Sequence, residues 1–219
     1  MGNLVTNLLQ FSRRSQQQIS TVNVCDEIEK TLELIHYHLR KNNIAVAREF
    51  KPEGPIIHAD RQQLRQLFLN LFTNASDAMP DGGTLTILVY TQGSDVMDQG
   101  SGDRGHGTEV RDQKTVSRNN PEPRSKIPDH KGEAFVIIEI ADTGVGIPPE
   151  ILPKVLEPFY TTKPEGKGTG LGLAICMRIA QAHNGTLNIT SEGGLGNGTR
   201  VCITLPFSNG SNSACLRDE

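Results

Sequence analysis

Apolar residues in the middle of the first half of the chain recur with the period of an α-helix. Residues 64–79 carry large apolar side chains at positions i, i+3, i+4, i+7, i+8 and i+11, namely Leu64, Leu67, Phe68, Leu71, Phe72 and Ala75. This spacing predicts an amphipathic helix with one buried face. Asp60 is placed to cap the helix, and Gln63 is placed to complete a capping box. Similar patterns predict helices at residues 1–19, 26–40 and 171–183, and a short one near 149–156.

Other apolar runs predict strands, at residues 44–50, 56–58, 84–91, 135–141, 186–191 and 199–206. The last two are expected to form a hairpin across the glycines of residues 193–198. We expect the helix at 171–183 to bury one side, formed by Leu171, Ala174, Ile175, Ile179 and Ala182. Interleaved helices and strands with hairpins predict an α+β fold, a two-layer α/β sandwich with helices on one face of a mixed sheet.

Residues 92–132 break the pattern, because Gly, Ser, Asp, Arg, Pro and Asn dominate there. Such a segment cannot bury enough apolar surface to offset its ordering entropy, so we predict a disordered insertion between two strands. Residues 208–219 are expected to be a flexible tail. The sequence therefore predicts one folded domain at residues 21–207, preceded by a separate helical segment at 1–20.

Composition adds limits rather than a function. A chain of 219 residues with 36% hydrophobic residues can build one sizeable core. Its net charge of −3 gives no bulk attraction to nucleic acid, so no nucleic-acid partner is expected. The 4 cysteines lack C-x-x-C spacing and are typical of reduced cytosolic thiols. No apolar run approaches the roughly 20 residues that span a bilayer, so we predict a cytoplasmic segment without membrane contact.

Four glycines alternate along the chain where the helix at 171–183 begins: Gly166, Gly168, Gly170 and Gly172. A glycine loop that opens a helix can bind phosphate, because the first N–H groups of the helix have no internal partner. A plain linker is an alternative. A dinucleotide-binding loop would follow a strand directly, and a P-loop would carry a glycine five residues before Gly166; neither condition is met.

Two further groups of polar residues are candidates for binding. Asp142 follows a strand expected to be buried and precedes Gly144 and Gly146, which leave room for a flat ring, although Asp-Thr-Gly is also an ordinary turn. The helix at 64–79 carries a polar stripe formed by Gln66, Asn70, Asn74 and Asp77. Amide oxygens beside a carboxylate suit a hard cation that carries phosphate, whereas the helix taken alone fits a solvated face equally well.

Taken in order, these motifs resemble those of one family, the sensor histidine kinases. The segment from Asn70 to Met79 resembles their asparagine box, and Asp142-Thr-Gly-Val-Gly146 resembles their adenine-binding glycine box. Residues 158–163 and 168–172 resemble their phenylalanine box and second glycine box, and residues 196–199 resemble their last glycine motif. The resemblance extends over about residues 1–206.

The resemblance implies a Bergerat-type ATP site, shared with gyrase and the MutL mismatch-repair protein. Asp142 would accept a hydrogen bond from the adenine amino group, which selects ATP over GTP. Asn74 would coordinate Mg²⁺, supported by Asn70. Phosphates would be wrapped by Gly168, Gly170 and Gly172, with positive charge from Lys163 or Lys167. The further residues assigned to the nucleotide are Asp77, Gly144, Gly146, Ile147, Phe159, Thr161, Thr162, Thr169, Leu171 and Thr199.

Position 70 bears on the type of reaction. The ATPases of this superfamily carry a glutamate there, which activates water, but an amide cannot accept a proton as a general base. Asn70 therefore favours phosphoryl transfer to histidine over ATP hydrolysis. Asp77 stands where some relatives have a basic residue, so no phosphate contact is expected of it.

None of the six histidines has the sequence setting of the phosphorylated histidine in this family, which precedes an acidic residue. Residues 1–20 resemble only the end of the second dimerisation helix. We therefore expect a fragment of a longer, homodimeric sensor, which acts with a dimerisation domain and a response regulator receiver domain. Two alternatives stay open: an ATP-binding regulatory module without phosphotransfer, and a gyrase-like or MutL-like ATPase.

Overall fold

The computed structural model of the chain describes residues 18–51, 53–93, 134–164, 168–191 and 198–207. Most of the predicted N-terminal helix, the predicted disordered insertion and the predicted flexible tail lie outside these residues. The described part contains three α-helices, one 3-10 helix and seven strands.

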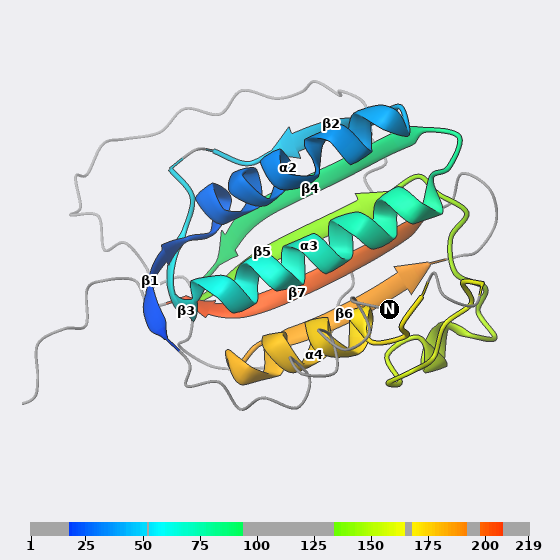
Figure 1. Cartoon of the computed structure of the whole chain (residues 1–219). Coiled ribbons are helices and arrows are strands. Elements are labelled where there is room, and N and C mark those ends of the chain that lie inside the picture. The colour runs from blue at the N-terminus through cyan, green and yellow to red at the C-terminus, as the bar shows by residue number, and fades with distance from the viewer. Residues whose placement is uncertain (1–17, 52, 94–133, 165–167, 192–197, 208–219) are drawn as a thin grey trace, which may run out of the picture.

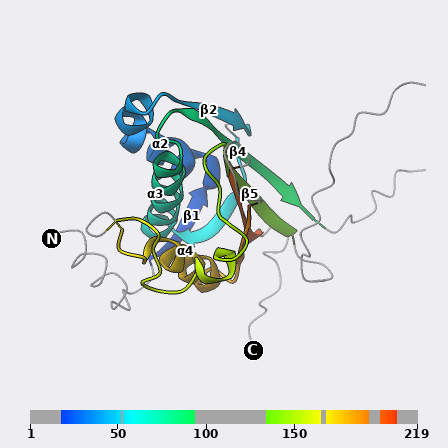
Figure 2. The same ribbon diagram turned by 90° about the vertical axis from the view of Figure 1, so that its right-hand side faces the viewer.

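Five of the strands form one mixed sheet, in the spatial order β2-β4-β5-β7-β6. They are β2 (Ile44–Glu49), β4 (Gly83–Gln92), β5 (Ala134–Asp142), β7 (Thr199–Phe207) and β6 (Thr186–Ser191). The pairing of β2 with β4 is parallel, and the other three pairings are antiparallel. Helices α2 (Val24–Lys41), α3 (Arg61–Ala78) and α4 (Gly172–Ala182) cover one face of this sheet (Figures 1 and 2). The predicted two-layer α/β sandwich is confirmed.

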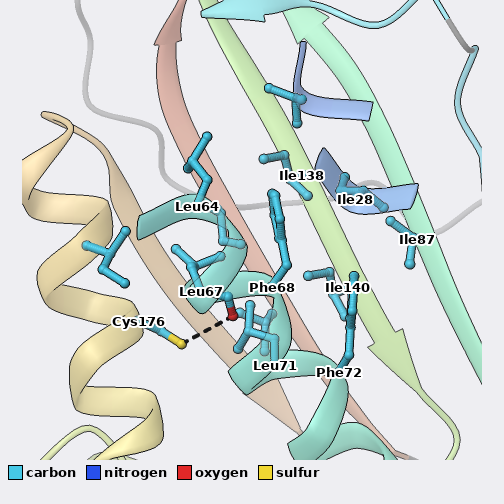
Figure 3. Close-up of a cluster of buried hydrophobic side chains, with 14 of the residues drawn as sticks. Ile28, Leu64, Leu67, Phe68, Leu71, Phe72, Ile87, Ile138, Ile140 and Cys176 are labelled. Atoms are coloured by element: carbon cyan, nitrogen blue, oxygen red, sulfur yellow. Dashed lines mark hydrogen bonds between the residues drawn. The ribbon is translucent and has the colours of Figure 1, made fainter. Parts of the chain in front are cut away.

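The apolar face of α3 forms the centre of the core. Figure 3 shows its side chains directed at the sheet, where they face Ile87 and Ile138, and at the neighbouring helices. The six apolar residues that define the period of α3 are all buried. The Phe68 and Phe72 rings stack with centroids 6.1 Å apart. Each fully buried side chain of this size contributes about 1.5–3 kcal/mol, so packing fixes which side of α3 faces the sheet.

The start of α3 is capped as predicted, but without the capping box. Asp60 Oδ1 accepts hydrogen bonds from the backbone N–H groups of Gln62 (2.9 Å) and Gln63 (3.1 Å). The backbone N–H of Asp60, which the Gln63 side chain was expected to reach, donates instead to Nε2 of His183 at 3.0 Å. Nδ1 of that buried ring lies 2.8 Å from the carbonyl oxygen of Ile179. The predicted capping box is wrong because a histidine at the end of α4 takes its donor.

The N-terminal side of the domain also differs from the prediction. Ile19, expected in a helix, lies in strand β1 (Ile19–Asn23), which pairs antiparallel with β3 (Ile56–Asp60) in a separate two-stranded sheet. Asn23 caps α2 by accepting from the N–H groups of Cys25 and Asp26, so this helix begins two residues earlier than expected. Pairing with β3 and burial of Val22 outweigh the local helical pattern.

Two smaller expectations are also corrected. The predicted helix near 149–156 is only a 3-10 turn, η1 (Leu152–Lys154), whose Pro153 removes a backbone donor and whose start has no side-chain cap. On α4, Ala182 is exposed rather than buried, because the helix ends there and the His183 ring takes the inward position.

We predict that His183→Leu lowers the free energy of unfolding by about 1–3 kcal/mol, because the buried N–H of Asp60 loses its acceptor. Urea unfolding followed by circular dichroism measures this. His36→Leu, at an exposed position of α2, is the matched control and should change stability by no more than about 0.5 kcal/mol. Equal stability of the His183 variant and the wild-type protein would contradict the proposed role of the ring.

Candidate functional site

One face of α3 brings the candidate motifs together. Asn70, Asn74 and Ala78 are four residues apart and therefore lie on the same side of the helix. Asn70 Nδ2 donates to the carbonyl oxygen of Gly172, at the start of α4, over 3.4 Å. Asn74 Oδ1 accepts from Lys163 Nζ at 3.3 Å. The three positions form a stripe that extends about 12 Å along the helix axis.

The third position of the stripe contacts the loop after β5. The carbonyl oxygen of Ala78 accepts a hydrogen bond from the backbone N–H of Val145 at 3.1 Å. An ideal Cβ added to Gly144 would lie 2.5 Å from the same oxygen, so only glycine permits this approach. The stripe thus touches the start of α4, the segment that contains Lys163, and the loop that follows Asp142.

Asp142 lies at the end of β5, and backbone donors hold its side chain. Oδ1 accepts from the N–H of Gly144 at 2.9 Å and from the N–H of Thr199 at 3.2 Å. Burial raises the pKa of this carboxyl group, and the two backbone hydrogen bonds oppose the rise. No hydrogen bond from a described residue reaches Oδ2. The carboxylate therefore keeps one oxygen as an acceptor for a donor outside the described chain.

The strands β6 and β7 complete this end of the site. Gly198 has a positive φ of 57°, and a Cβ there would lie 1.7 Å from the carbonyl oxygen of Asp142. Ser191 Oγ accepts from the N–H of Ile147 and donates to the carbonyl oxygen of Gly198, both at 2.7 Å. Ser191 stands in no motif, and Ala78 contributes only a backbone carbonyl, so neither was singled out in the sequence. Their contacts join segments distant along the chain.

The glycines before α4 pack against the segment at residues 158–163. The N–H of Phe159 donates to the carbonyl oxygen of Gly170 at 2.9 Å. Gly170 has a φ of 65°, and a Cβ there would lie 2.3 Å from the carbonyl carbon of Phe159. Phe159 itself has a φ of 69° and a side chain that is 60% exposed. The backbone of this segment is therefore fixed by the loop, while the ring faces outward.

Other residues of the loop form short local contacts. The N–H of Lys163 donates to Thr161 Oγ1 at 3.2 Å, and the N–H of Leu171 donates to Thr169 Oγ1 at 3.4 Å. Thr162 is exposed. Gly166 and Lys167 lie outside the described residues. The predicted residues from Phe159 to Leu171 that are described therefore lie in the segments before α4, and Gly172 is the first residue of that helix.

Charged side chains near Asn74, on α3 and on the segment that contains Lys163, are paired with each other. Lys163 Nζ lies 2.5 Å from Asp77 Oδ2, on the turn of α3 that follows Asn74. His38 Nε2, on α2, lies 4.0 Å from the other oxygen of Asp77. Lys163 was expected to meet phosphate, and here it contacts a carboxylate and an amide oxygen. The sequence alone did not indicate this pair.

A hollow of about 1,200 Å³ lies elsewhere, where Arg48, Phe50, Tyr90 and Phe207 are among its lining residues. None of the candidate site residues lines it, so chemistry rather than volume identifies the site. Within the described ranges, no group of three or more His, Cys, Asp or Glu side chains is arranged to hold a metal ion. Asn74 offers an amide oxygen, a type of ligand that suits a hard cation. None of the described helices is long and apolar enough to cross a membrane.

Known proteins are similar to this chain in sequence. Residues 123–209 match the family described as histidine kinase-, DNA gyrase B-, and HSP90-like ATPase. Sensor kinase CckA of Brucella abortus is 33% identical over 208 residues, and Sporulation kinase C of Bacillus subtilis is 30% identical over 203 residues. These alignments cover 94% and 92% of this chain, including α3. The chain spans only 19% and 38% of the two relatives.

Solved structures share the fold. The catalytic domain of histidine kinase ThkA, in a nucleotide-free form, superposes with a TM-score of 0.60 at 24% identity, covering 88% of this chain and 99% of that domain. ThkA in complex with response regulator protein TrrA gives a TM-score of 0.62 at 21% identity, with 94% of this chain and 47% of that chain covered. The likeness extends across both layers of the sandwich. The chain therefore contains an ATP-binding domain of the histidine kinase-, DNA gyrase B-, and HSP90-like ATPase family, and over most of its length it is similar to sensor kinases.

Proposed function

We propose that this domain binds ATP with Mg²⁺ and transfers the γ-phosphoryl group to a histidine on a dimerisation domain, for relay to a response regulator. One observation carries the proposal. The stripe of α3 joins the Asp142 loop to the start of α4 across about 12 Å, so that a base acceptor and an anion site face one extended ligand. Relatives named as sensor kinases, and the ThkA complex with a response regulator, support the proposed relay.

At one end of the site, Asp142 would receive the adenine amino group. Its Oδ1 is already held by two backbone donors, which fixes the direction of Oδ2. Guanine carries an acceptor in place of that amino group and would leave the half-buried carboxylate unpaired. Gly144, Gly146, Ile147 and Thr199 would line the ring. The absence of a Cβ at Gly144 lets this loop approach α3 closely.

At the other end, the loop at residues 168–172 would wrap the phosphates. The first turn of α4 has no side-chain cap, so its backbone N–H groups are available to an anion. Asn74 would hold Mg²⁺ through Oδ1, with Asn70 fixed beside it by Gly172. The ion, when bound, neutralises charge on the phosphates. Lys163, or Lys167 from outside the described residues, would add positive charge.

Asn70 favours transfer over hydrolysis. Its amide cannot accept a proton from water, and its Nδ2 donates a hydrogen bond to the carbonyl oxygen of Gly172. A neutral imidazole nitrogen has a free lone pair and needs no general base. An acceptor histidine presented to the γ-phosphate can therefore react where water is not activated.

We also infer how the domain belongs to a longer protein. Residues 21–207 would form the catalytic domain, and residues 1–20 would include the end of a dimerisation helix, although Ile19 and Ser20 lie in strand β1. The complete sensor would be a homodimer, and this part of it would work in the cytoplasm.

We predict that Asp142→Asn weakens ATP binding by about 1.5–3 kcal/mol, or roughly 10- to 150-fold. The asparagine oxygen can still accept from Gly144 and Thr199, so its amide nitrogen would then present a donor to the adenine amino group. Calorimetric titration measures the affinity. Asp81→Asn, at an exposed turn, is the control and should bind ATP like the wild-type protein. Equal affinity of the Asp142 variant would refute the adenine assignment.

We predict that Asn74→Ala abolishes phosphotransfer and leaves the fold intact, because Asn74 lies on the polar stripe and not among the buried apolar residues of α3. Transfer to a supplied dimerisation domain in the presence of Mg²⁺ is measured beside the circular dichroism spectrum. Asn188→Ala, at an exposed position of β6, provides a matched substitution away from the site. An active Asn74 variant would contradict the metal role.

We predict that this chain alone does not autophosphorylate on histidine but phosphorylates a separately supplied dimerisation domain. No histidine of the chain precedes an acidic residue, and His183 uses both ring nitrogens within the fold. Transfer should be slow, because separate domains lose the effective concentration of a covalent link.

Radiolabelled ATP, with and without the supplied domain, tests both halves of this prediction. Acid-labile label on this chain alone would identify one of its own histidines as an acceptor. Failure to label any histidine-bearing domain would instead favour a module that binds ATP as a conformational ligand.

A further inference from the structure

The ammonium group of Lys163 contacts Asn74 Oδ1, the oxygen atom of α3 that would bind the metal in the proposed function. Its ammonium group lies 3.3 Å from Asn74 Oδ1 and 2.5 Å from Asp77 Oδ2. The side chains of Lys163 and Asp77 are 34% and 39% exposed, so the pair stands at the edge of the site rather than inside the core. In the structure, Lys163 thus provides the positive charge at Asn74.

We propose that Asp77 is a specificity-determining residue: by holding Lys163 on α3, it makes the site select the metal complex of the nucleotide over the metal-free nucleotide. The inference rests on the proposed function and deepens it, because it names the form of ATP that the site accepts.

The first step concerns the metal-bound form. Two cations cannot both sit on Asn74 Oδ1 without repelling each other, since charges about 3–4 Å apart interact strongly even near water. A divalent ion delivered with the nucleotide therefore displaces the ammonium group of Lys163 from this oxygen. The displaced ammonium group becomes available to the phosphates of the same ligand.

The second step concerns the free nucleotide. It brings a highly charged anion and no cation, so nothing displaces Lys163 from Asn74. The carboxylate of Asp77 keeps the ammonium group neutralised, and the phosphates meet a lysine that is already paired. Asp77 itself repels them. The free form therefore loses the cationic contact that the metal-bound form gains.

The third step is that Lys163 can change partner without unfolding its loop. Its backbone N–H is anchored on Thr161. An ideal Cβ on Gly168 would lie 3.0 Å from Cβ of Lys163 and 3.4 Å from its Cδ. The stem of the lysine thus lies between the phosphate loop and α3, in a position that glycine keeps open. A rotation of the side chain is enough to exchange the carboxylate for a phosphate.

The exposure of the pair separates this role from a structural one. Exposed ion pairs add little to the stability of a fold, so loss of the Asp77 carboxylate should leave the unfolding curve nearly unchanged. Its effect should appear in the ratio of two binding constants. His38, 4.0 Å from Asp77 Oδ1, is a second basic neighbour, and His38→Gln serves to show that it does not set the ratio.

The experiment measures the dissociation constant of ATP by calorimetry, once with excess Mg²⁺ and once with EDTA. We expect Asp77→Asn to tighten the binding of metal-free ATP about two- to fivefold, the range that one released, partly screened charge gives, and to change the binding of Mg²⁺-ATP much less. Asp77→Glu should restore the wild-type ratio. Asp81→Asn and His38→Gln should leave it unchanged. In a Lys163→Met background, Asp77→Asn should lose most of its effect, because the two residues act as a pair.

An unchanged ratio in Asp77→Asn would overturn the inference. So would weaker Mg²⁺-ATP binding with metal-free binding unaltered, which would make Asp77 a metal ligand. A full effect in the Lys163→Met background would reduce Asp77 to simple repulsion of the phosphates and overturn the role of Lys163. If the wild-type chain bound neither form of ATP, the proposed function would fail and the inference with it, whereas binding without a change in the ratio rejects the inference alone.

Discussion

The site depends on the rotational setting of α3. The apolar face of this helix is held by several buried side chains, each of which contributes about 1.5–3 kcal/mol, while neutral hydrogen bonds such as that of Asn70 contribute about 0.5–1.5 kcal/mol each. Packing therefore decides where Asn70, Asn74 and Ala78 point, and the polar contacts follow. A rotation of α3 that buried one of the asparagines would move all three contacts at once, so the core and the nucleotide site are not independent.

Close contacts between backbone segments hold the loops of the site in place around α3. At Gly144, Gly170 and Gly198, a Cβ would come within 2.5 Å of backbone atoms of another segment. These three positions join α3 to the loop after β5, the Phe159 segment to the loop before α4, and the start of β7 to the end of β5. The glycines matter less as flexible residues than as positions where two segments of the chain come into contact. Asp142 is aimed by such contacts, since the strands and loops that donate to it are held together by Gly198 and Ser191.

The sequence predicted the parts of this arrangement that depend on local periodicity. Helix α3 and its two asparagines follow from spacing within a single element, and Asp142 from its place at the end of a strand. Contacts between distant residues could not be predicted in this way. The Asp60–His183 hydrogen bond joins residues 123 positions apart, and the Lys163–Asp77 pair joins residues 86 positions apart. Strand β1 was missed for the same reason, because it forms by pairing with β3, far along the chain. The roles of the candidate residues came from the family resemblance and remain proposals.

Two carboxylates of the site, those of Asp142 and Asp77, differ in how a ligand would change their interactions. Asp142 is half-buried with a raised pKa and one oxygen without a donor in the described chain, so a ligand N–H removes part of the cost of keeping it charged. Asp77 is partly exposed and already paired with Lys163, so a ligand must form a stronger interaction with that lysine to separate the pair. In the proposed function, the Asp142 carboxylate favours a base that carries a suitable donor, and Asp77 holds Lys163 until a divalent cation binds with the nucleotide. In the proposed function, recognition of the base and control of the phosphate charge are thus divided between two acidic groups. The loop after Asp142 contacts Ala78, and Asp77 pairs with the lysine that contacts Asn74, one turn earlier on α3.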